Sequence, residues 1–374
     1  MRILLAPDKF KGTLDAPSVA AAMALGVRDA LPDAEVRLHP LADGGEGSLD
    51  CVAATVPGSF ATIAAEDAFG APVAVRAFDD GTVAMIAAHE TQRLATRPVP
   101  AAALRASSRG TGLALVEARR SFPEREIVVW VGGTASTDGA AGAAAAAGWR
   151  FEDARGRELE SGGGALRRLA RIEPPPTPVG GSITGACDVD NPLLGERGAA
   201  RMFSSQKGAG PSEMQVLEEG LHRLAECVRR DVGIDVASLP HGGAGGGLGA
   251  GLVAFFGGTL DDGFSRIASA TGLHGALEWA DVVLTGEGRV DEGSLGGKVA
   301  SNVAHLCTSA RKTCIVVAGE VALPVGLLPA ERALGAAAVA SVVDGCGRAA
   351  AFAETAGCVR KVTAEVVRRR VAPR

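Results

Sequence analysis

Acidic and basic side chains stand among glycines in the segment 281–298. Glu287, Arg289, Asp291 and Lys298 follow the apolar run 282–284. Such a run is typical of a strand buried on both faces, and open α/β sheets bind ligands at the carboxyl ends of their strands. Carboxylates beside Arg and Lys on a glycine-rich backbone suit a phosphate with its metal ion. A charged turn that binds nothing is the alternative.

Two further charged turns lie near the N-terminus. Residues 7–12 carry Asp8, Lys9 and Lys11 at the end of an expected strand, where Lys can hold an anion and Asp a metal ion or a hydroxyl group. Asp43 and Glu46 occupy a glycine-rich turn before a helix. Each turn has a simpler interpretation, an ordinary charged loop for the first and acids favoured by a helix N-terminus for the second.

A strand meets glycines and hydroxyl groups in the segment 132–139. Gly133, Thr134, Ser136 and Asp138 stand where a helix is expected to begin, and backbone N–H groups there form an anion site. Helix capping by Ser136, Thr137 or Asp138 would explain the same pattern.

The segment 185–195 contains two carboxylates separated by one residue. In an extended chain Asp188 and Asp190 point to the same side, opposite to Val189. Two like charges held that close repel unless a cation or a shared proton intervenes, so the pair suits Mg²⁺ or a general base. An Asx-turn before Pro192 is the alternative. Gln206 and Lys207 follow shortly afterwards.

The glycine run 242–251 opens an apolar helix. A G-x-G-x-x-G match inside so many glycines is weak evidence for a dinucleotide site, and 257–260 is not a convincing following strand. Close approach of Gly245 and Gly246 to nucleotide phosphates fits equally well. No Walker-type motif occurs, since Gly297-Lys298 lacks the earlier glycine and is followed by Val299.

Strand–helix alternation, typical of a parallel sheet, is expected at both ends of the chain, with an antiparallel-rich portion between them. Antiparallel hairpins are expected between 60 and 105, and the proline-rich stretch 171–181 is expected to be a surface connection. The remaining predictions are strands at 2–6, 35–41, 127–133, 281–288, 314–319 and 337–343, and helices at 16–31, 140–147 and 213–232. This pattern indicates a discontinuous α/β domain with a second domain inserted into it.

Composition narrows the class of protein. The 374 residues are long enough for two domains, and a net charge of −5 argues against nucleic acid as a partner. The seven scattered cysteines indicate reduced thiols. With no signal-peptide core and no long apolar stretch, we expect a cytoplasmic protein without a membrane partner.

Taken together and in this order, these segments resemble the glycerate kinases of the bacterial type-2 class, the glycerate 2-kinase family. The resemblance rests on residues 7–12, 43–47, 133–139, 186–193, 206–209, 243–250 and 285–291 with Gly297-Lys298. It covers essentially the whole length. Ser205, Gly243 and Gly293-Ser294 depart from the family's usual residues. Of these, Ser205 and Gly293-Ser294 are expected near the pocket.

The resemblance implies a two-domain α/β fold with the active site in the cleft between the domains. A flavodoxin-like parallel domain would comprise 1–60 and 275–374, and a mixed α/β domain likened to restriction endonucleases would comprise 61–274. It also implies phosphorylation of D-glycerate by ATP with Mg²⁺, usually to 2-phosphoglycerate. The sequence does not exclude 3-phosphoglycerate, and it leaves a homodimer open.

The same resemblance implies roles for individual residues. Asp188 is expected to be the base, with Asp190 as the alternative, and Lys11, Arg289 and Lys207 are candidates for the substrate carboxylate. Further substrate contacts are expected from Asp8, Lys9, Asp43, Glu46, Asn191 and Gln206. Nucleotide contacts are expected from Gly133, Thr134, Ser136, Asp138, Gly245, Gly246 and Lys298. Metal ligands are expected from Asp190, Glu287 and Asp291.

Two other functions stay open at this point. A kinase of another small hydroxy acid would use the same pocket with a different arrangement of cations. A non-catalytic sensor of a sugar acid or nucleotide would bind its ligand without consuming ATP.

Overall fold

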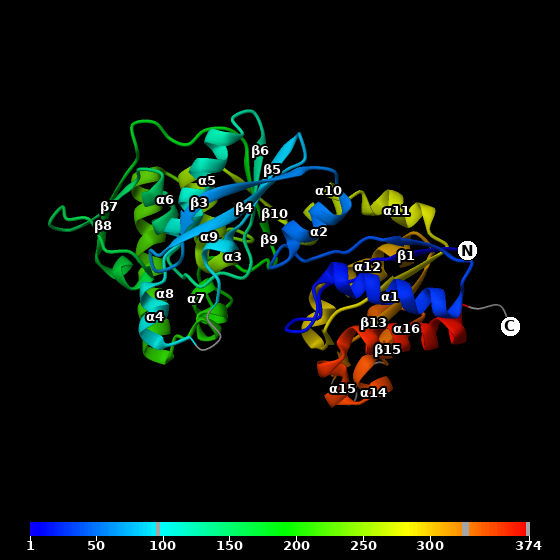
Figure 1. Cartoon of the computed structure of the whole chain (residues 1–374). Helices are drawn as coiled ribbons and strands as arrows, with labels where there is room; N and C mark the ends of the chain where they lie inside the picture. The colour runs from blue at the N-terminus through cyan, green and yellow to red at the C-terminus, as the bar shows by residue number, and fades with distance from the viewer. Residues whose placement is uncertain (95–97, 324–328, 372–374) are drawn as a thin grey trace. The chain divides into compact units, whose positions relative to one another are not determined.

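The computed structural model describes residues 1–94, 98–323 and 329–371, which form two compact units (Figure 1). The first unit comprises Met1–Asp43, Asp50–Pro57 and Phe264–Arg374, and the second comprises Gly44–Leu49 and Gly58–Gly263. The predicted domain boundaries stay a prediction, because compactness alone does not test which segments fold independently.

The first unit is built on a five-stranded parallel sheet. Its strands are β1 (Arg2–Leu5), β2 (Glu35–Leu38), β11 (Val282–Thr285), β13 (Thr313–Ala318) and β15 (Ala338–Ser341). They lie in the order β15-β13-β11-β1-β2. Numbered within the sheet this is the order 2-1-3-4-5, which confirms the predicted flavodoxin-like class.

Helices cover both faces of this sheet. Ile3, Ile315 and Val317 belong to a core shared with α1 (Ala16–Ala30) and α16 (Thr355–Arg370), which lie side by side in Figure 1. Val316 and Ala318 point into a smaller core with Ala300 of α12 (Val299–Ser309). Alternate residues of β13 are thus buried on opposite faces, as parallel sheets require.

Shorter elements complete the first unit. They are α11 (Leu273–Trp279), α12 (Val299–Ser309), α13 (Ala330–Leu334), α14 (Val342–Cys346), α15 (Arg348–Ala353), the 3₁₀ turn η4 (Glu292–Gly296) and the strand pair β12 (Arg289–Val290) and β14 (Glu320–Val321). Helices α2 (Ser48–Thr55) and α10 (Gly263–Ala270) begin in the second unit and continue in the first.

The second unit contains a six-stranded mixed sheet in the order β10-β9-β6-β5-β4-β3. Its strands are β3 (Ser59–Glu66), β4 (Pro72–Asp79), β5 (Val83–Ala87), β6 (Glu126–Trp130), β9 (Ile183–Cys187) and β10 (Thr259–Asp262). The pairs from β5 to β10 are parallel, and those of β3 with β4 and β4 with β5 are antiparallel. A mixed α/β class is therefore confirmed, whereas the likeness to restriction endonucleases stays a prediction.

Helices and one separate hairpin surround this sheet. The helical elements are α3 (Ala88–Thr91), α4 (Pro100–Arg105), α5 (Arg109–Ser121), α6 (Ala141–Ala146), η1 (Gly163–Arg168), α7 (Ala199–Phe203), η2 (Ser205–Lys207), α8 (Pro211–Cys227), the π-helical turn η3 (Val228–Val232) and α9 (Ala244–Phe256). The hairpin pairs β7 (Arg150–Asp153) with β8 (Leu169–Glu173). Within the described ranges no helix is long and apolar enough to cross a membrane.

Three sequence predictions need correction. Residues 171–173 are not part of a connection, because they pair with β7 before Pro174 ends the ladder. Hairpins account for 59–87 only, and α3 and α4 follow them. Residues 259–262 form a strand although their composition does not predict one, because they pair with β9 in parallel.

Candidate functional site

Two buried carboxylates lie at the carboxyl ends of adjacent strands in the first unit. Asp8 follows β1 and Glu287 follows β11, and the strand order reverses between these two strands. The Asp8 N–H donates a 2.8 Å hydrogen bond to the Gly286 carbonyl, which ties the two loops together. Such a reversal is where open α/β sheets bind ligands.

Burial controls the charge of both carboxylates. Asp8 is 8% exposed and Glu287 is 4% exposed. Burial raises the pKa of each to about 7; Lys9 opposes this at Asp8, and Lys298 opposes it at both. The Oε1 atom of Glu287 has no hydrogen-bond partner among the described residues, and Oε2 lies 3.7 Å from Lys298 Nζ.

Lys298 and its neighbours complete what we call the strand-end cluster: Asp8, Glu287, Asp291 and Lys298. Lys298 precedes α12, and its Nζ also lies 3.6 Å from Asp291 Oδ1. Asp291 is in turn 3.6 Å from Nε of the exposed Arg289. A cation beside a helix N-terminus suits an anion, and the carboxylates suit a metal ion.

The strand-end cluster fits Mg²⁺ better than a metal that needs a full protein cage. Glu287 Oε1 has no partner in the part of the chain that the structure describes, and Asp8 and Glu287 are two buried like charges, so a bound cation would stabilise both. No group of three or more His, Cys, Asp or Glu that could hold a metal occurs in the part of the chain that the structure describes. Mg²⁺ usually takes one or two carboxylates together with waters and substrate phosphates.

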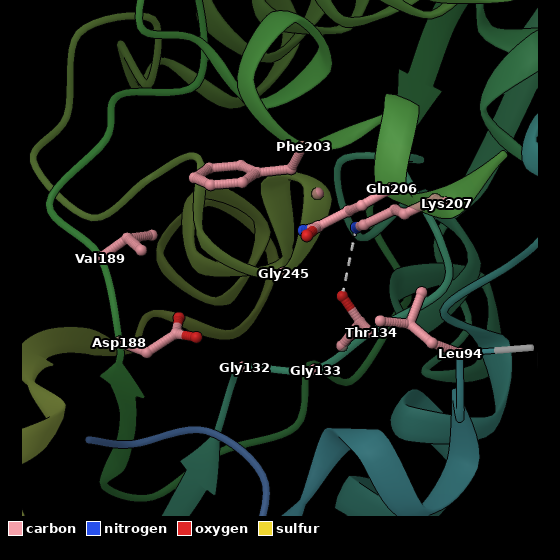
Figure 2. Close-up of a pocket in the computed structure, with 11 residues that line it drawn as sticks. Leu94, Gly132, Gly133, Thr134, Asp188, Val189, Phe203, Gln206, Lys207 and Gly245 are labelled. Carbon is pink, nitrogen blue, oxygen red and sulfur yellow. Dashed lines mark hydrogen bonds between the residues drawn. The ribbon is translucent and has the colours of Figure 1, made fainter. Parts of the chain in front are cut away.

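The second unit contains a pocket at the carboxyl ends of its adjacent strands β6 and β9 (Figure 2). We call it the glycine pocket, and its lining residues are Leu94, Gly132, Gly133, Thr134, Asp188, Val189, Phe203, Gln206, Lys207, Gly245 and Gly246. Figure 2 shows Asp188 and Val189 on one side and Thr134, Gln206 and Lys207 on the other. Polar groups of opposite charge thus face a common space.

Lys207 supplies the positive charge of the glycine pocket. Its Nζ donates to the Ser136 carbonyl at 2.5 Å and to Thr134 Oγ1 at 3.4 Å. Burial lowers the pKa of this amine to about 8, while Asp138 and Asp188 oppose the shift. At neutral pH the side chain is therefore an ammonium group available to an anion.

Close backbone approach at Gly132 places Asp188. A Cβ atom at Gly132 would lie 2.5 Å from Asp188 Oδ2 and 2.7 Å from Gly45 Cα. Only glycine leaves room for this carboxylate and for the 44–47 turn together.

The glycine run forms the floor of the pocket through a left-handed turn. Gly245, Gly246 and Gly247 have φ values of 63°, 70° and 93°. A Cβ atom at Gly246 would lie 2.1 Å from the Ser136 carbonyl oxygen and 2.9 Å from Lys207 Nζ. Glycine is needed here for both its conformation and its size.

The size of the glycine pocket limits what it can hold. Its volume is about 70 Å³. Sites for drug-sized ligands span roughly 300–1,000 Å³. Within this small space, Lys207 suits a negatively charged group and Asp188 suits a hydroxyl group.

Comparison with known proteins assigns the chain to a family. The sequence profile of the glycerate kinase family matches residues 3–371. This chain belongs to the glycerate kinase family. A glycerate kinase of Halalkalibacterium halodurans is 36% identical over 325 residues, which cover 85% of this chain and 85% of that protein. A glycerate 2-kinase of Escherichia coli is 36% identical over 334 residues, which cover 88% of this chain and 87% of the relative.

A solved structure agrees with the sequence comparison. The crystal structure from Salmonella typhimurium LT2 that carries the name glycerate kinase 2 is 34% identical and superposes with a TM-score of 0.79. The match covers 98% of this chain and 97% of that one. The predicted family and the predicted enzyme class, a kinase, are confirmed.

Most site residues predicted from the sequence lie in one of the two groups of this family member. The glycine pocket includes Gly133, Thr134, Asp188, Gln206, Lys207, Gly245 and Gly246. The strand-end cluster includes Asp8, Glu287, Asp291 and Lys298, with Arg289 beside Asp291. Lys9 and Asp43 act on the pKa of Asp8, which places them near this cluster.

Other predicted residues lie outside the pocket lining. Asp190 is exposed and forms a 2.6 Å ion pair with Arg197, whose carbonyl accepts a bond from the Asn191 amide. Asp138 is buried, does not line the pocket and accepts bonds from the N–H and hydroxyl of Ser108.

Three more predicted residues, Ser136, Glu46 and Lys11, do not line the pocket either. The Ser136 side chain is buried and does not line the pocket, although its carbonyl holds Lys207. Glu46 and Lys11 are exposed. The roles predicted for all these residues stay predictions.

Four pocket residues were not found from the sequence: Leu94, Gly132, Val189 and Phe203. Gly132 belongs to the segment 132–139 and Val189 to the segment 185–195, but neither is among the predicted site residues. The three apolar residues carry no local signal, because an apolar side chain in a pocket and one in a core have the same pattern in sequence.

Proposed function

We propose that this chain transfers the γ-phosphoryl group of ATP to D-glycerate and that the product is 2-phosphoglycerate. The observation that carries the proposal is the glycine pocket, a small cavity that the Asp188 carboxylate and the buried Lys207 ammonium group both face. The Escherichia coli relative is named a glycerate 2-kinase, which supports the 2-hydroxyl as the acceptor.

The glycine pocket is proposed to bind the hydroxy acid. Lys207 would pair with the substrate carboxylate, and Asp188 would accept the proton of the attacking hydroxyl. Leu94, Val189 and Phe203 would contact the carbon atoms. Glycine N–H groups can hold phosphate as well as carboxylate, so ATP phosphates are the other option for Gly133, Gly245 and Gly246; the small volume favours the acid.

The strand-end cluster is proposed to serve the phosphates of ATP. Lys298 would bind a phosphate at the start of α12, and Asp8 and Glu287 would hold Mg²⁺. When bound, Mg²⁺ neutralises phosphate charge. Phosphoryl transfer depends mainly on positioning and charge neutralisation, so a base, two lysines and two carboxylates are chemically sufficient.

An ADP-release assay with D-glycerate, ATP and Mg²⁺ tests the proposal directly. Turnover with D-glycerate above that with other hydroxy acids is expected, and a ³¹P NMR spectrum of the product identifies the phosphorylated hydroxyl. Faster turnover with another hydroxy acid would favour that acid as the substrate. Ligand binding without ADP release would favour a sensor. A cytoplasmic location and a homodimer stay predictions.

A further inference from the structure

His241 has a backbone conformation that its side chain disfavours. Its φ is 64°, and among the described residues only Ala140 and Arg311 are other non-glycine residues with positive φ. The left-handed region is readily open only to glycine and costs other residues conformational energy. Strain of this kind persists where surrounding contacts impose it, and it clusters at functional sites.

The contacts that impose it join His241 to the loop after β9. The ring Nδ1 is 2.8 Å from the Val189 carbonyl oxygen, and the backbone N–H donates to the Asp190 carbonyl at 3.1 Å. Gly243 adds a third bond, from its N–H to the Asn191 carbonyl at 2.8 Å. Three successive carbonyls after Asp188 are therefore held from one short segment.

The same residue is packed against the start of α9. Its carbonyl accepts a 3.0 Å bond from the Ala244 N–H, and a Cβ atom at Gly249 would lie 2.5 Å from that carbonyl oxygen. Ala244 immediately precedes Gly245 and Gly246, which line the glycine pocket. His241 thus connects the two walls of the pocket, one bearing Asp188 and the other made of glycine.

The chemistry of the ring bond is fixed by its partner. A carbonyl oxygen only accepts, so Nδ1 must carry a proton. Both the neutral Nδ1–H tautomer and the imidazolium ion meet this requirement. The geometry therefore provides a constant restraint on the Val189 carbonyl.

We infer that His241 is a positioning residue for Asp188: its ring holds the Val189 peptide, and this orients the preceding carboxylate toward the glycine pocket (Figure 2). The inference rests on the proposed function for its effect on catalysis. Asp188 and Val189 both line the pocket. A displacement of the Val189 carbonyl would therefore shift the short connection after β9 and move the Asp188 carboxylate and the Val189 side chain together.

A pair of substitutions separates the ring bond from backbone strain. His241→Gly removes the ring, and glycine adopts positive φ without strain. In His241→Asn, asparagine tolerates positive φ and keeps an amide N–H near the position of Nδ1. Arg311→Gly is the matched control, because Arg311 has a φ of 54° and lies in the first unit, outside the strand-end cluster.

We expect His241→Gly to lower kcat about tenfold, as loss of one positioning hydrogen bond would, with an unchanged melting temperature. His241→Asn should recover most of kcat, and Arg311→Gly should match the wild type. Wild-type kcat in His241→Gly would overturn the inference, as would an equal loss in His241→Asn. If His241→Gly has a lowered melting temperature, the kcat of His241→Asn relative to the wild type tests the inference instead.

Hydrogen exchange of the peptide containing 188–194 provides a readout that does not depend on activity. Faster exchange in His241→Gly than in His241→Asn and the wild type is expected. Equal exchange in all three proteins would overturn the positioning role. If the wild type did not phosphorylate D-glycerate, the proposed function would fail, and the exchange comparison would still decide the role of His241.

Discussion

The Lys207 ammonium group donates a 2.5 Å hydrogen bond to the carbonyl oxygen of Ser136. A carbonyl dipole does not neutralise a full charge, and burial therefore lowers the pKa of Lys207 to about 8 despite Asp138 and Asp188. The cation in the glycine pocket is present at pH 7 and is lost as the pH rises through 8. An incoming carboxylate would add a further negative charge beside this buried ammonium group.

The first prediction concerns the alkaline limit of activity. For D-glycerate, kcat/KM should fall above pH 8, because only the ammonium form of Lys207 binds the carboxylate. Lys207→Met should lower kcat/KM about 10–100-fold at pH 7, since a hydrogen bond to a charged group contributes about 1.5–3 kcal/mol. It should also remove the alkaline decline. A decline that persists unchanged in Lys207→Met would assign it to another group.

The second prediction separates the two carboxylates after β9. Asp188→Asn should reduce kcat about 10²–10⁴-fold, the usual contribution of a general base, with the melting temperature retained. Asp190→Asn is the matched control, because Asp190 is 66% exposed and paired with Arg197, and surface pairs contribute little. Steady-state kinetics of both variants decide the matter. A large loss in Asp190→Asn with near-normal turnover in Asp188→Asn would reverse the assignment.

The third prediction tests the close approach at Gly132. In Gly132→Ala the new methyl group would meet Asp188 Oδ2 at 2.5 Å and the backbone of Gly45 at 2.7 Å. Overpacking of this kind costs about 1–3 kcal/mol of stability, and displacement of Asp188 should lower kcat as well. Gly180→Ala, where a Cβ atom has nothing within 4 Å, should change neither quantity. Normal kcat in Gly132→Ala would show that the pocket tolerates the displacement.

The fourth prediction uses stability rather than activity. Burial raises the pKa of Glu287 from 4.5 to about 7, so between these values the folded protein binds a proton that the unfolded chain does not. The stability contributed by this group is therefore present at low pH and lost as the pH rises toward 7. Asp8 acts in the same direction.

Glu287→Gln should consequently raise the free energy of unfolding by about 1–3 kcal/mol at pH 8 in EDTA and change it little at pH 5. Its kinase activity should fall. Glu292→Gln, in the same loop but exposed, should leave stability within about 0.5 kcal/mol. Thermal melts at the two pH values provide the measurement; a destabilised Glu287→Gln at pH 8 would mean that the Lys298 interaction outweighs burial.

Local patterns in the sequence predicted much of the fold. Strands β1, β11 and β13 are short, mostly apolar runs followed within three residues by glycine or a charged side chain, and this pattern depends only on neighbouring residues. The strand at 259–262 was missed because its residues, Thr259-Leu-Asp-Asp262, gain their ladder from β9, far away in the chain. Pairing of this kind is a tertiary effect that overrides local propensity.

The site shows the same division. Glycines, carboxylates and lysines at expected strand ends were recognisable, since open α/β sheets bind ligands there. The expectation that Asp188 and Asp190 share one side relied on an extended chain, but β9 ends at Cys187 and the alternation of side chains ends with it. Only Asp188 lines the glycine pocket.

The sequence by itself determined the family, the α/β class and the segments that carry charge among glycines, because each is encoded by contiguous residues. Only the tertiary structure decided that Lys207 lies buried against Ser136 and that His241 is hydrogen-bonded to the Val189 carbonyl. It also decided that Glu287 Oε1 has no hydrogen-bond partner within the described ranges. Burial and hydrogen bonding between distant segments set pKa values and side-chain directions, and neither is a property of a local stretch of chain.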